Sequence, residues 1–418
     1  MFISDSNDKN LFSYLSTTFS YWLFMLSDGA LRMIVLFNFH SLGYTPIKLA
    51  YIFLIYELMG MIANLYAGWL AARFGLTITL YLGFIIQILA LGLLTFANDF
   101  YLEINQVLFV MLIYGLSGLS KDLTKMSAKS AVKLVVKEGE NKKLFNWISI
   151  LTGSKNTIKG IGFFLGAILI GYFDYKLSLI IMACILFLVV VIIYTIKPII
   201  NNKKIKKKDI KLFSTVHNIN LLSISRFFLF GARDIWFVVS LPVFFYIFLE
   251  SKNVSQFSNF LIVGGSLAIW IIFYGFIQSF APKIINFSTN KLQESLLKSK
   301  PWFLSLLICS GLISLLSIIL SNFSLYPYIL LISLFFFGFF FALNSSVHSY
   351  LIVSLSNKEN ITLDVGFYYM SNAAGRFIGT LLSGLSYQLY GIKGSLILST
   401  IFIALSYSFY NKIKYQKN

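Results

Sequence analysis

Charged side chains recur inside the long apolar segments of this chain, and the basic ones outnumber the acidic ones. A charge at the centre of a bilayer costs at least about 2.5–3.5 kcal/mol on insertion scales, so such residues usually have a partner or a function. A cavity lined by more cations than anions would attract an anion. The charged residues in these segments are Asp28, Arg32, Glu57, Lys121, Asp122, Lys125, Lys155, Lys159, Arg226, Arg233, Asp234 and Arg376.

Helical spacing places several of these groups on common faces. Lys155 and Lys159 are four residues apart and share a face. If their helix begins near residue 145, they lie roughly 15–21 Å into the membrane at about 1.5 Å per residue, too deep for easy contact with the interface. Arg226 and Arg233 lie on one stripe of a later helix, where Arg226 is either a ligand or an interfacial anchor.

These side chains suggest an oxyanion site. The planar guanidinium of arginine can bind phosphate or arsenate through two hydrogen bonds, while lysine acts as a movable point charge. A mixed set from several helices therefore suits an anion with two charged ends. The predicted substrate-binding residues are Arg32, Lys121, Lys125, Lys155, Lys159, Arg233 and Arg376. The carboxylates Asp28, Asp122 and Asp234 are predicted to be ion-pair partners or sites of proton coupling, and Asp28 has the spacing to pair with Arg32.

Four lysines recur at four-residue intervals in "LSGLSKDLTKMSAKSAVKL" (116–134). If the helix begins near residue 106, Lys121 lies about 22 Å down a core of about 30 Å, and Lys125 lies near its inner edge. Lys129 and Lys133 then reach the cytoplasmic interface, where an excess of basic residues is usual. We therefore expect only the first two lysines to reach an anion inside the protein.

The helices that would position these groups follow from composition. The chain has 418 residues, is 58% hydrophobic and only 12% charged, and has a mean hydropathy of +0.79. Apolar segments of about 20 residues, enough to cross a core of about 30 Å, recur throughout. The prediction is an all-α polytopic membrane protein with twelve transmembrane helices. They are expected at about 14–39, 48–71, 76–97, 106–128, 145–172, 177–196, 218–248, 257–281, 302–320, 327–352, 363–389 and 394–411.

Basic residues concentrate in alternate loops. The longest basic loop, "KPIINNKKIKKKDIKLF" (197–213), divides the predicted spans six and six. The excess of Lys and Arg on one side predicts cytoplasmic termini, in a multi-pass protein of the inner (plasma) membrane of a prokaryote. The predicted organisation is a six-helix bundle (1–196), a basic cytoplasmic linker (197–217) and a second six-helix bundle (218–418).

Other classes of function are disfavoured. The net charge of +18 is distributed as expected for a membrane protein and does not predict nucleic-acid binding. The only two cysteines, Cys184 and Cys309, fall in separate predicted helices, which argues against a disulfide framework or a multi-thiol metal site. The sequence has no phosphate-binding Gly–Lys loop and no His-Glu-x-x-His motif, so we expect no enzymatic activity, catalytic residue, metal or cofactor.

The arrangement of six plus six spans resembles the major facilitator superfamily, in which two halves rock around a site at the membrane midplane. The segments "SKNTIKGIGFFLG" and "SNAAGRFIGTLLSG" support an internal repeat, because they align Lys159 with Arg376. The loop "GWLAARFGLTI" keeps Arg73 and Gly75 of the superfamily's signature, but it has Ala72 in place of the acidic residue.

Five longer blocks resemble the ArsJ family, which are major facilitator permeases of arsenic-resistance operons. The blocks carry charges at unusual positions and extend from the first predicted helix to the eleventh. They are "SYWLFMLSDGALRMIVLFNFHSLGYTP" (20–46), "GLSKDLTKMSAKSAVKL" (118–134), "LTGSKNTIKGIGFFLG" (151–166), "RFFLFGARDIWFVVSLPVF" (226–244) and "YYMSNAAGRFIGTLLSGLSYQ" (368–388).

This resemblance implies export of 1-arseno-3-phosphoglycerate, the compound that glyceraldehyde-3-phosphate dehydrogenase makes when arsenate replaces phosphate. Export would remove the compound before it hydrolyses back to arsenate, which makes the dehydrogenase a functional partner without requiring physical contact. An anionic organoarsenical suits the predicted basic cavity, whereas trivalent arsenic would need several soft sulfur ligands together. The alternative is an exporter or exchanger of another phosphorylated organic anion.

Overall fold

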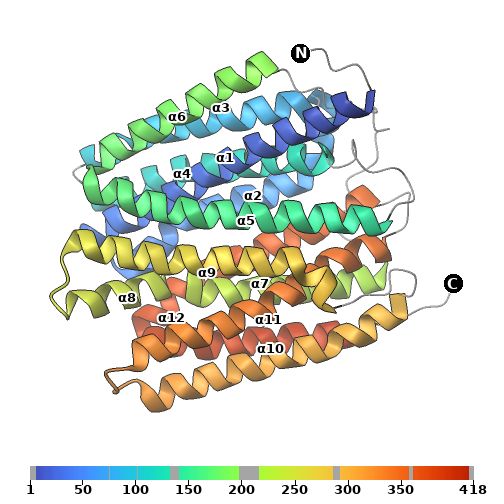
Figure 1. Ribbon diagram of the computed structural model, residues 1–418. Helices are drawn as coiled ribbons and strands as arrows, with labels where there is room; N and C mark the ends of the chain where they lie inside the picture. The colour runs from blue at the N-terminus through green and yellow to red at the C-terminus, as the bar shows by residue number, and fades with distance from the viewer. Residues whose placement is uncertain are drawn as a thin grey trace.

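The structure is a computed structural model that describes residues 6–74, 76–100, 102–131, 141–196, 216–285, 292–356 and 361–413. Within these ranges every regular element is helical (Figure 1). The helices are α1 (Ser6–Ser41), α2 (Pro46–Phe74), α3 (Leu76–Leu94), the 3-10 turn η1 (Ala97–Asp99), α4 (Glu103–Ala131), α5 (Asn141–Tyr172), α6 (Tyr175–Ile196), α7 (His217–Phe237), α8 (Ser240–Glu250), α9 (Gln256–Ile285), α10 (Leu292–Leu320), α11 (Tyr326–Leu355) and α12 (Ile361–Asn411).

The described residues make twelve membrane crossings, as predicted. Ten helical stretches are long and apolar enough to cross a membrane, and one of them combines α7 with α8 (His217–Glu250). Helix α5 is not among the ten because residues such as Lys155 and Lys159 lower its hydropathy, although it is 32 residues long. Helix α12 has 51 residues, about 76 Å if straight, which is more than twice the thickness of the hydrocarbon core. It therefore supplies two crossings.

Helix α12 reverses direction at Gly391. This glycine has φ 64° and ψ −162°, a conformation that residues with a Cβ rarely adopt. The hydroxyls of Ser386 and Ser395 are 2.8 Å apart, although nine residues of straight helix would separate them by about 13 Å. The two arms of α12 correspond to the predicted helices at 363–389 and 394–411.

The span predicted as one helix at 218–248 is broken between α7 and α8. Pro242 has no N–H group, so it cannot form the helical hydrogen bond to the carbonyl four residues earlier. The backbone N–H groups of Val239 and Ser240 instead donate to Ser383 Oγ, at 3.2 and 3.1 Å. These two N–H groups are thus satisfied inside the protein, as the interior of a membrane requires.

The helices lie in two groups, α1–α6 and α7–α12, and both termini lie at the same end of the bundle (Figure 1). Helix α5 packs along α9, and α2 packs along α12, so these pairs join the two groups. In the half away from the termini, every residue in 27–37 and in 229–243 is buried. The bundle is therefore tightly packed in that half. Residues 197–215 lie outside the described part of the chain, so the predicted linker and the exact bundle boundaries stay predictions.

Glycines bring α5 close to its neighbours. A Cβ at Gly160 would lie 2.8 Å from the carbonyl oxygen of Ala268 on α9, and a Cβ at Gly166 would lie 2.8 Å from Ala30 Cα on α1. Both distances are shorter than real Cβ contacts, so these positions need glycine for close helix approach. Helix α5 consequently contacts both groups of helices and presents its lysines between them.

We predict that Gly166→Ala destabilises the protein by about 1–3 kcal/mol, because the added methyl group overpacks the contact between α5 and α1. The measurement is thermal unfolding of the detergent-purified protein. Gly92→Ala in α3 is the control, because a Cβ there meets no atom within 4 Å. Equal melting temperatures for the two variants would contradict the close packing.

Candidate anion-binding cavity

A cavity of about 120 Å³ lies between the two groups of helices. One water needs about 10–15 Å³ of such space, so the cavity has room for several waters or a small organic molecule. Helices α1, α2, α4 and α5 line it from one group, and α7, α9, α11 and α12 line it from the other. Each crossing thus contributes only a few side chains, and the site is assembled from distant parts of the sequence.

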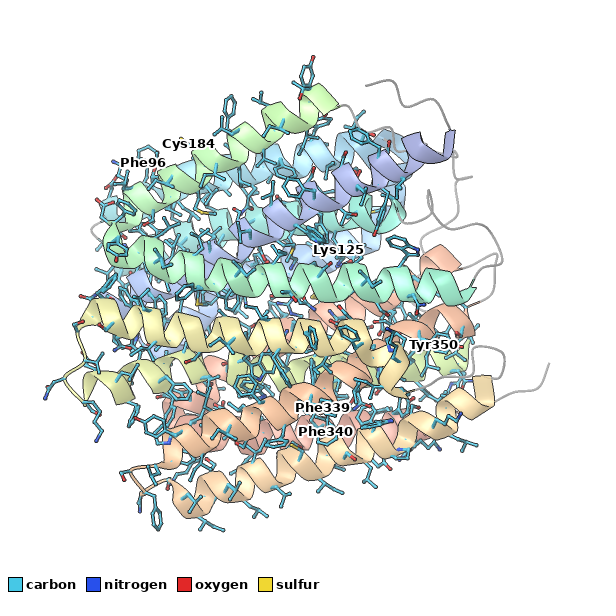
Figure 2. All side chains as sticks on the ribbon, viewed as in Figure 1. Phe96, Lys125, Cys184, Phe339, Phe340 and Tyr350 are labelled. Carbon is cyan, nitrogen blue, oxygen red and sulfur yellow. The ribbon has the colours of Figure 1, made fainter. Side chains whose placement is uncertain are left out.

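All seven predicted substrate-binding residues lie on the cavity wall: Arg32, Lys121, Lys125, Lys155, Lys159, Arg233 and Arg376. Asp122 also lies on the wall, while Asp28 and Asp234 lie behind it and contact the wall through ion pairs. Figure 2 shows Lys125 among the helices of the first group, toward the end that carries the termini. The structure brings the predicted residues together, and their role in binding stays a prediction.

The cavity extends from the middle of the bundle toward the termini. On α1 the lining residues run from Arg32 back to Tyr21, about 16 Å along the helix axis. On α9 they run from Ile271 to Gln278, which is again toward that end. This direction agrees with the burial of every residue in 27–37 and in 229–243, which lie in the opposite half.

Asp28 is the centre of a buried cluster in the first group. It accepts short hydrogen bonds from Lys159 Nζ and from Tyr56 Oη, which link α1 to α5 and α2. The pairing of Asp28 with Arg32, which the sequence spacing allowed, is not what the structure shows. Arg32 instead contacts Glu57 of α2 at 3.3 Å, with its guanidinium 5.4 Å from the centre of the Tyr56 ring. A neighbouring helix offers each group a nearer partner than its own helix does.

A second cluster lies where α4 meets α2. Lys125 Nζ forms a short ion pair with Asp122 Oδ1 and donates to Asn64 Oδ1 at 2.9 Å. Lys121 Nζ lies 3.8 Å from Asp122 Oδ2 and 4.1 Å from the centre of the Tyr56 ring, close enough for a cation–π interaction. One carboxylate therefore contacts two lysines.

The structure describes the side chains of only two of the four regularly spaced lysines in this segment. Lys121 and Lys125 line the cavity, as their expected depth indicated. The side chain of Lys129 and the whole of Lys133 lie outside the described part of the chain, so their anchoring role stays a prediction.

Arg376 joins the two groups of helices. From the first arm of α12 its Nε donates to Asp234 Oδ2 of α7 at 2.9 Å, and its Nη2 donates to Glu57 Oε1 of α2 at 2.5 Å. Arg233 Nε lies 2.5 Å from the other oxygen of Asp234. A chain of alternating charges therefore crosses the middle of the bundle, in the order Arg32, Glu57, Arg376, Asp234 and Arg233.

Arg226 was left open as a ligand or an interfacial anchor, and the structure places it inside the cavity. Only 4% of its surface is exposed. Its Nε donates to Asn372 Oδ1 at 3.0 Å, its Nη1 donates to the Ser345 carbonyl at 3.1 Å, and its guanidinium lies 3.8 Å from the centre of the Phe230 ring. No carboxylate of the described residues forms an ion pair with it. Arg226 is therefore a buried cation with neutral partners.

The cavity wall carries an excess of positive charge. Eight basic residues of the described chain line the cavity: Arg32, Lys121, Lys125, Lys155, Lys159, Arg226, Arg233 and Arg376. Four carboxylates contact members of this set: Asp28, Glu57, Asp122 and Asp234. On the wall the basic residues of the described chain therefore outnumber these carboxylates. Surrounded by low-dielectric helices, such an excess favours a bound anion.

Sequence reasoning missed two kinds of site residue. Glu57 was recognised as an intramembrane charge but was given no role, although the basic excess in the other helices indicated a need for another carboxylate. The neutral side chains Tyr274, Gln278 and Ser345 also line the cavity. They belong to apolar helices without any motif, so no signal in the sequence separated them from ordinary polar residues of a helix.

The cavity has no features of a metal or thiol site in the part of the chain that the structure describes. There, no three His, Cys, Asp or Glu side chains group in a way that could hold a metal ion. Cys184 is exposed on α6, where Figure 2 shows it at the outer flank of the bundle, and Cys309 is partly buried on α10. The two thiols therefore lie on helices that do not line the cavity.

Comparison with known proteins gives the family. The fold is similar to the solved "Crystal structure of a bacterial homologue of iron transporter ferroportin in outward-facing state", with a TM-score of 0.70 and 14% identity over 96% of this chain and 99% of that chain. At this identity the likeness shows the fold alone. A search of curated proteins found no match. The model of the family described as "Major Facilitator Superfamily" matches residues 17–293 and 298–414, nearly the whole sequence. The chain therefore belongs to the major facilitator superfamily of membrane transporters.

Proposed function

We propose that this transporter exports an organic oxyanion, that its cargo is 1-arseno-3-phosphoglycerate, and that it thereby confers arsenate resistance. The observation that carries the proposal is the predominance of basic residues on the cavity wall: eight of the described lining residues are basic, and two, Glu57 and Asp122, are acidic. The resemblance to the ArsJ family names this cargo among the anions that such a wall would attract. Glyceraldehyde-3-phosphate dehydrogenase would be the functional partner that produces it.

Alternating access between the two bundles would carry the cargo across the membrane. Arg376 of the second bundle bonds to Glu57 of the first at 2.5 Å, so this contact links the two moving parts. An anion that shares the guanidinium of Arg376 would weaken the link, because it competes with the Glu57 carboxylate for the same donors. Binding of cargo would thereby favour the relative movement of the bundles.

The proposed direction is outward across the inner membrane of a prokaryote. The basic loops predict that the termini are cytoplasmic, so a cavity that extends toward the termini would load from the cytoplasm, where the dehydrogenase makes the cargo. An interior-negative potential favours the exit of anions by about 2.3 kcal/mol per charge per 100 mV. The proposed export therefore does not require proton antiport.

The second candidate is a transporter of another phosphorylated organic anion. The charge excess supports it equally, because the wall attracts any small polyanion of suitable size. The similar solved structure is that of a homologue of an iron transporter, but an iron ion does not suit this cavity. A wall with eight basic residues and four carboxylates would repel a divalent cation.

We predict that expression in an arsenate-sensitive host raises the tolerated arsenate concentration only when the dehydrogenase is co-expressed, because the cargo must be made before it is exported. The measurements are growth inhibition by arsenate and the amount of arsenic that leaves the cells. Protection without the dehydrogenase would exclude an organoarsenical cargo. Export of phosphorylated acids without any protection would instead identify the second candidate.

We also predict that Lys155→Ala and Arg376→Ala each remove most of this protection. Loss of a charged hydrogen-bonding group typically costs about 1.5–3 kcal/mol, or about 10–100-fold in affinity. Lys176→Ala is the control, because Lys176 is exposed at the far end of the bundle. Immunoblots of the membranes establish equal abundance. Full protection by both cavity variants would refute the cavity as the binding site.

A third prediction concerns the link through Glu57. Glu57→Gln should lower the melting temperature strongly, because breaking a buried ion pair costs about 3–5 kcal/mol, and Arg32 and Arg376 would lose their shared carboxylate. Adding Arg376→Gln should restore part of the loss by removing an uncompensated charge. Glu103→Gln is the control, since Glu103 pairs with Lys48 in a contact where these side chains are 49% and 40% exposed. If the melting temperature of the double variant fell by the sum of the two single-variant losses, the coupling between Glu57 and Arg376 would be contradicted.

A further inference from the structure

The wall around Arg226 differs in chemistry from the rest of the cavity. We infer that Arg226, Tyr274, Gln278, Ser345 and Asn372, called here the Arg226 subsite, bind a phosphate-monoester group and so hold one end of the cargo. The inference rests on the proposed function, which supplies a phosphorylated organic anion. It gives Arg226, which the sequence left open between a ligand and an interfacial anchor, a binding role and assigns that role to one chemical group.

The five side chains come from α7, α9, α11 and α12, and hydrogen bonds to Ser345 and to Arg226 join them. Arg226 Nη1 donates to the Ser345 carbonyl at 3.1 Å. Tyr274 Oη and Gln278 Nε2 each lie 3.3 Å from Ser345 Oγ. Asn372 accepts from Arg226 Nε on the other side at 3.0 Å. The subsite is therefore organised before any ligand binds, which reduces the entropy that binding must overcome.

The guanidinium of Arg226, which lines the cavity, has one terminal nitrogen without a hydrogen-bond partner among the described residues. Its Nε and Nη1 are used in hydrogen bonds, whereas Nη2 has no hydrogen-bond partner among the described residues and is not enclosed by protein atoms. The centre of the Phe230 ring lies 3.8 Å from the guanidinium carbon, so the ring packs against the guanidinium group. An anion that binds Nη2 would therefore not have to break an existing hydrogen bond of that nitrogen.

The charge of this subsite is not neutralised, in contrast to that of Arg376. An anion that binds Arg376 must compete with Glu57 and Asp234, which already contact its guanidinium. The partners of Arg226 are an amide oxygen, a carbonyl and a hydroxyl, none of which carries a charge. The more highly charged end of a cargo molecule therefore gains most at Arg226. A phosphate monoester carries about −1.5 to −2 at neutral pH and has three strong acceptor oxygens.

The donors around Arg226 match such an acceptor group. Asn156 of α5 donates to Gln278 Oε1 at 2.7 Å, so the amide nitrogen of Gln278 is turned toward Ser345 and the cavity. Tyr274 adds a hydroxyl, and Lys155 lines the cavity from α5, in the other group of helices. Neutral donors and fixed cations together form the usual environment of a phosphate group.

The subsite and the Arg376 cluster are spaced for one small molecule with two anionic ends. Asn372, which holds Arg226, is one helical turn from Arg376 on α12, about 6 Å along the axis. This is the scale of a three-carbon chain with a group at each end. The geometry thus assigns the phosphate end to Arg226 and the other oxyanion to the cluster at Arg376.

The test measures binding of 3-phosphoglycerate and of glycerate, which lacks the phosphate, to the purified full-length protein. Arg226→Gln should weaken binding of 3-phosphoglycerate about 10–100-fold and leave binding of glycerate nearly unchanged. Asn372→Asp should have the same selective effect. It keeps an oxygen acceptor for Arg226 Nε but places a carboxylate against the guanidinium, which neutralises the subsite.

The Asn372→Asp variant distinguishes a role of Arg226 in binding from a role in stabilising the fold. If Arg226 only stabilised the fold, Asn372→Asp would strengthen its contact and leave the binding of both probes unchanged, which would overturn the inference. Asn105→Asp is the matched control, because it adds the same charge at an exposed position of α4 outside the cavity. Equal losses for both probes would also overturn the inference. Failure of the unmodified protein to bind 3-phosphoglycerate would instead overturn the proposed function, and the subsite with it.

Discussion

The contact of Arg376 with two carboxylates determines how the middle of this protein is arranged. A guanidinium at that depth is costly unless carboxylates contact it. Arg376 receives one from each group of helices, Glu57 from α2 and Asp234 from α7. This requirement places Glu57 of α2, Asp234 of α7 and Arg376 of α12 at the same depth in the bundle. It also means that the two bundles meet through charges as well as through packing.

Close helix packing supplies the second condition. The backbones of α1, α5 and α9 approach one another where α5 has glycine, and this approach brings Lys159 within reach of Asp28. Among the described residues, four carboxylates on four different helices contact the basic wall. The neutral partners of Arg226 let this cation stay buried without an ion pair to a described carboxylate. An anionic cargo would complete this charge balance when it binds.

The membrane crossings and the basic residues of the cavity could be predicted from the sequence because a small number of physical constraints determine them. The length of an apolar segment shows a span, and a charge deep within a span must turn toward protein or water. Ion-pair partners were not predictable to the same degree. The spacing of Asp28 and Arg32 indicated a shared face, but the nearer partners were Lys159 and Glu57 on other helices. The ion-pair partner of a residue depends on how the helices pack, and the spacing of residues within one helix carries no information about that packing.

A cargo with two ends would use the two parts of the cavity in different ways. Arg226 lies about 13 Å from the start of α7, whereas Arg376 lies about 22 Å from the start of α12, so Arg226 is nearer the end with the termini. An anion bound at Arg226 alone leaves the contact between Glu57 and Arg376 intact, because Arg226 has no part in it. An anion that also reaches Arg376 competes with Glu57 and loosens the link between the bundles. Inorganic phosphate would then occupy the first position without promoting movement, while a molecule long enough to reach both would be carried. Selectivity for an anion with two charged ends would follow from the position of the ion pair between Glu57 and Arg376, which joins the two bundles.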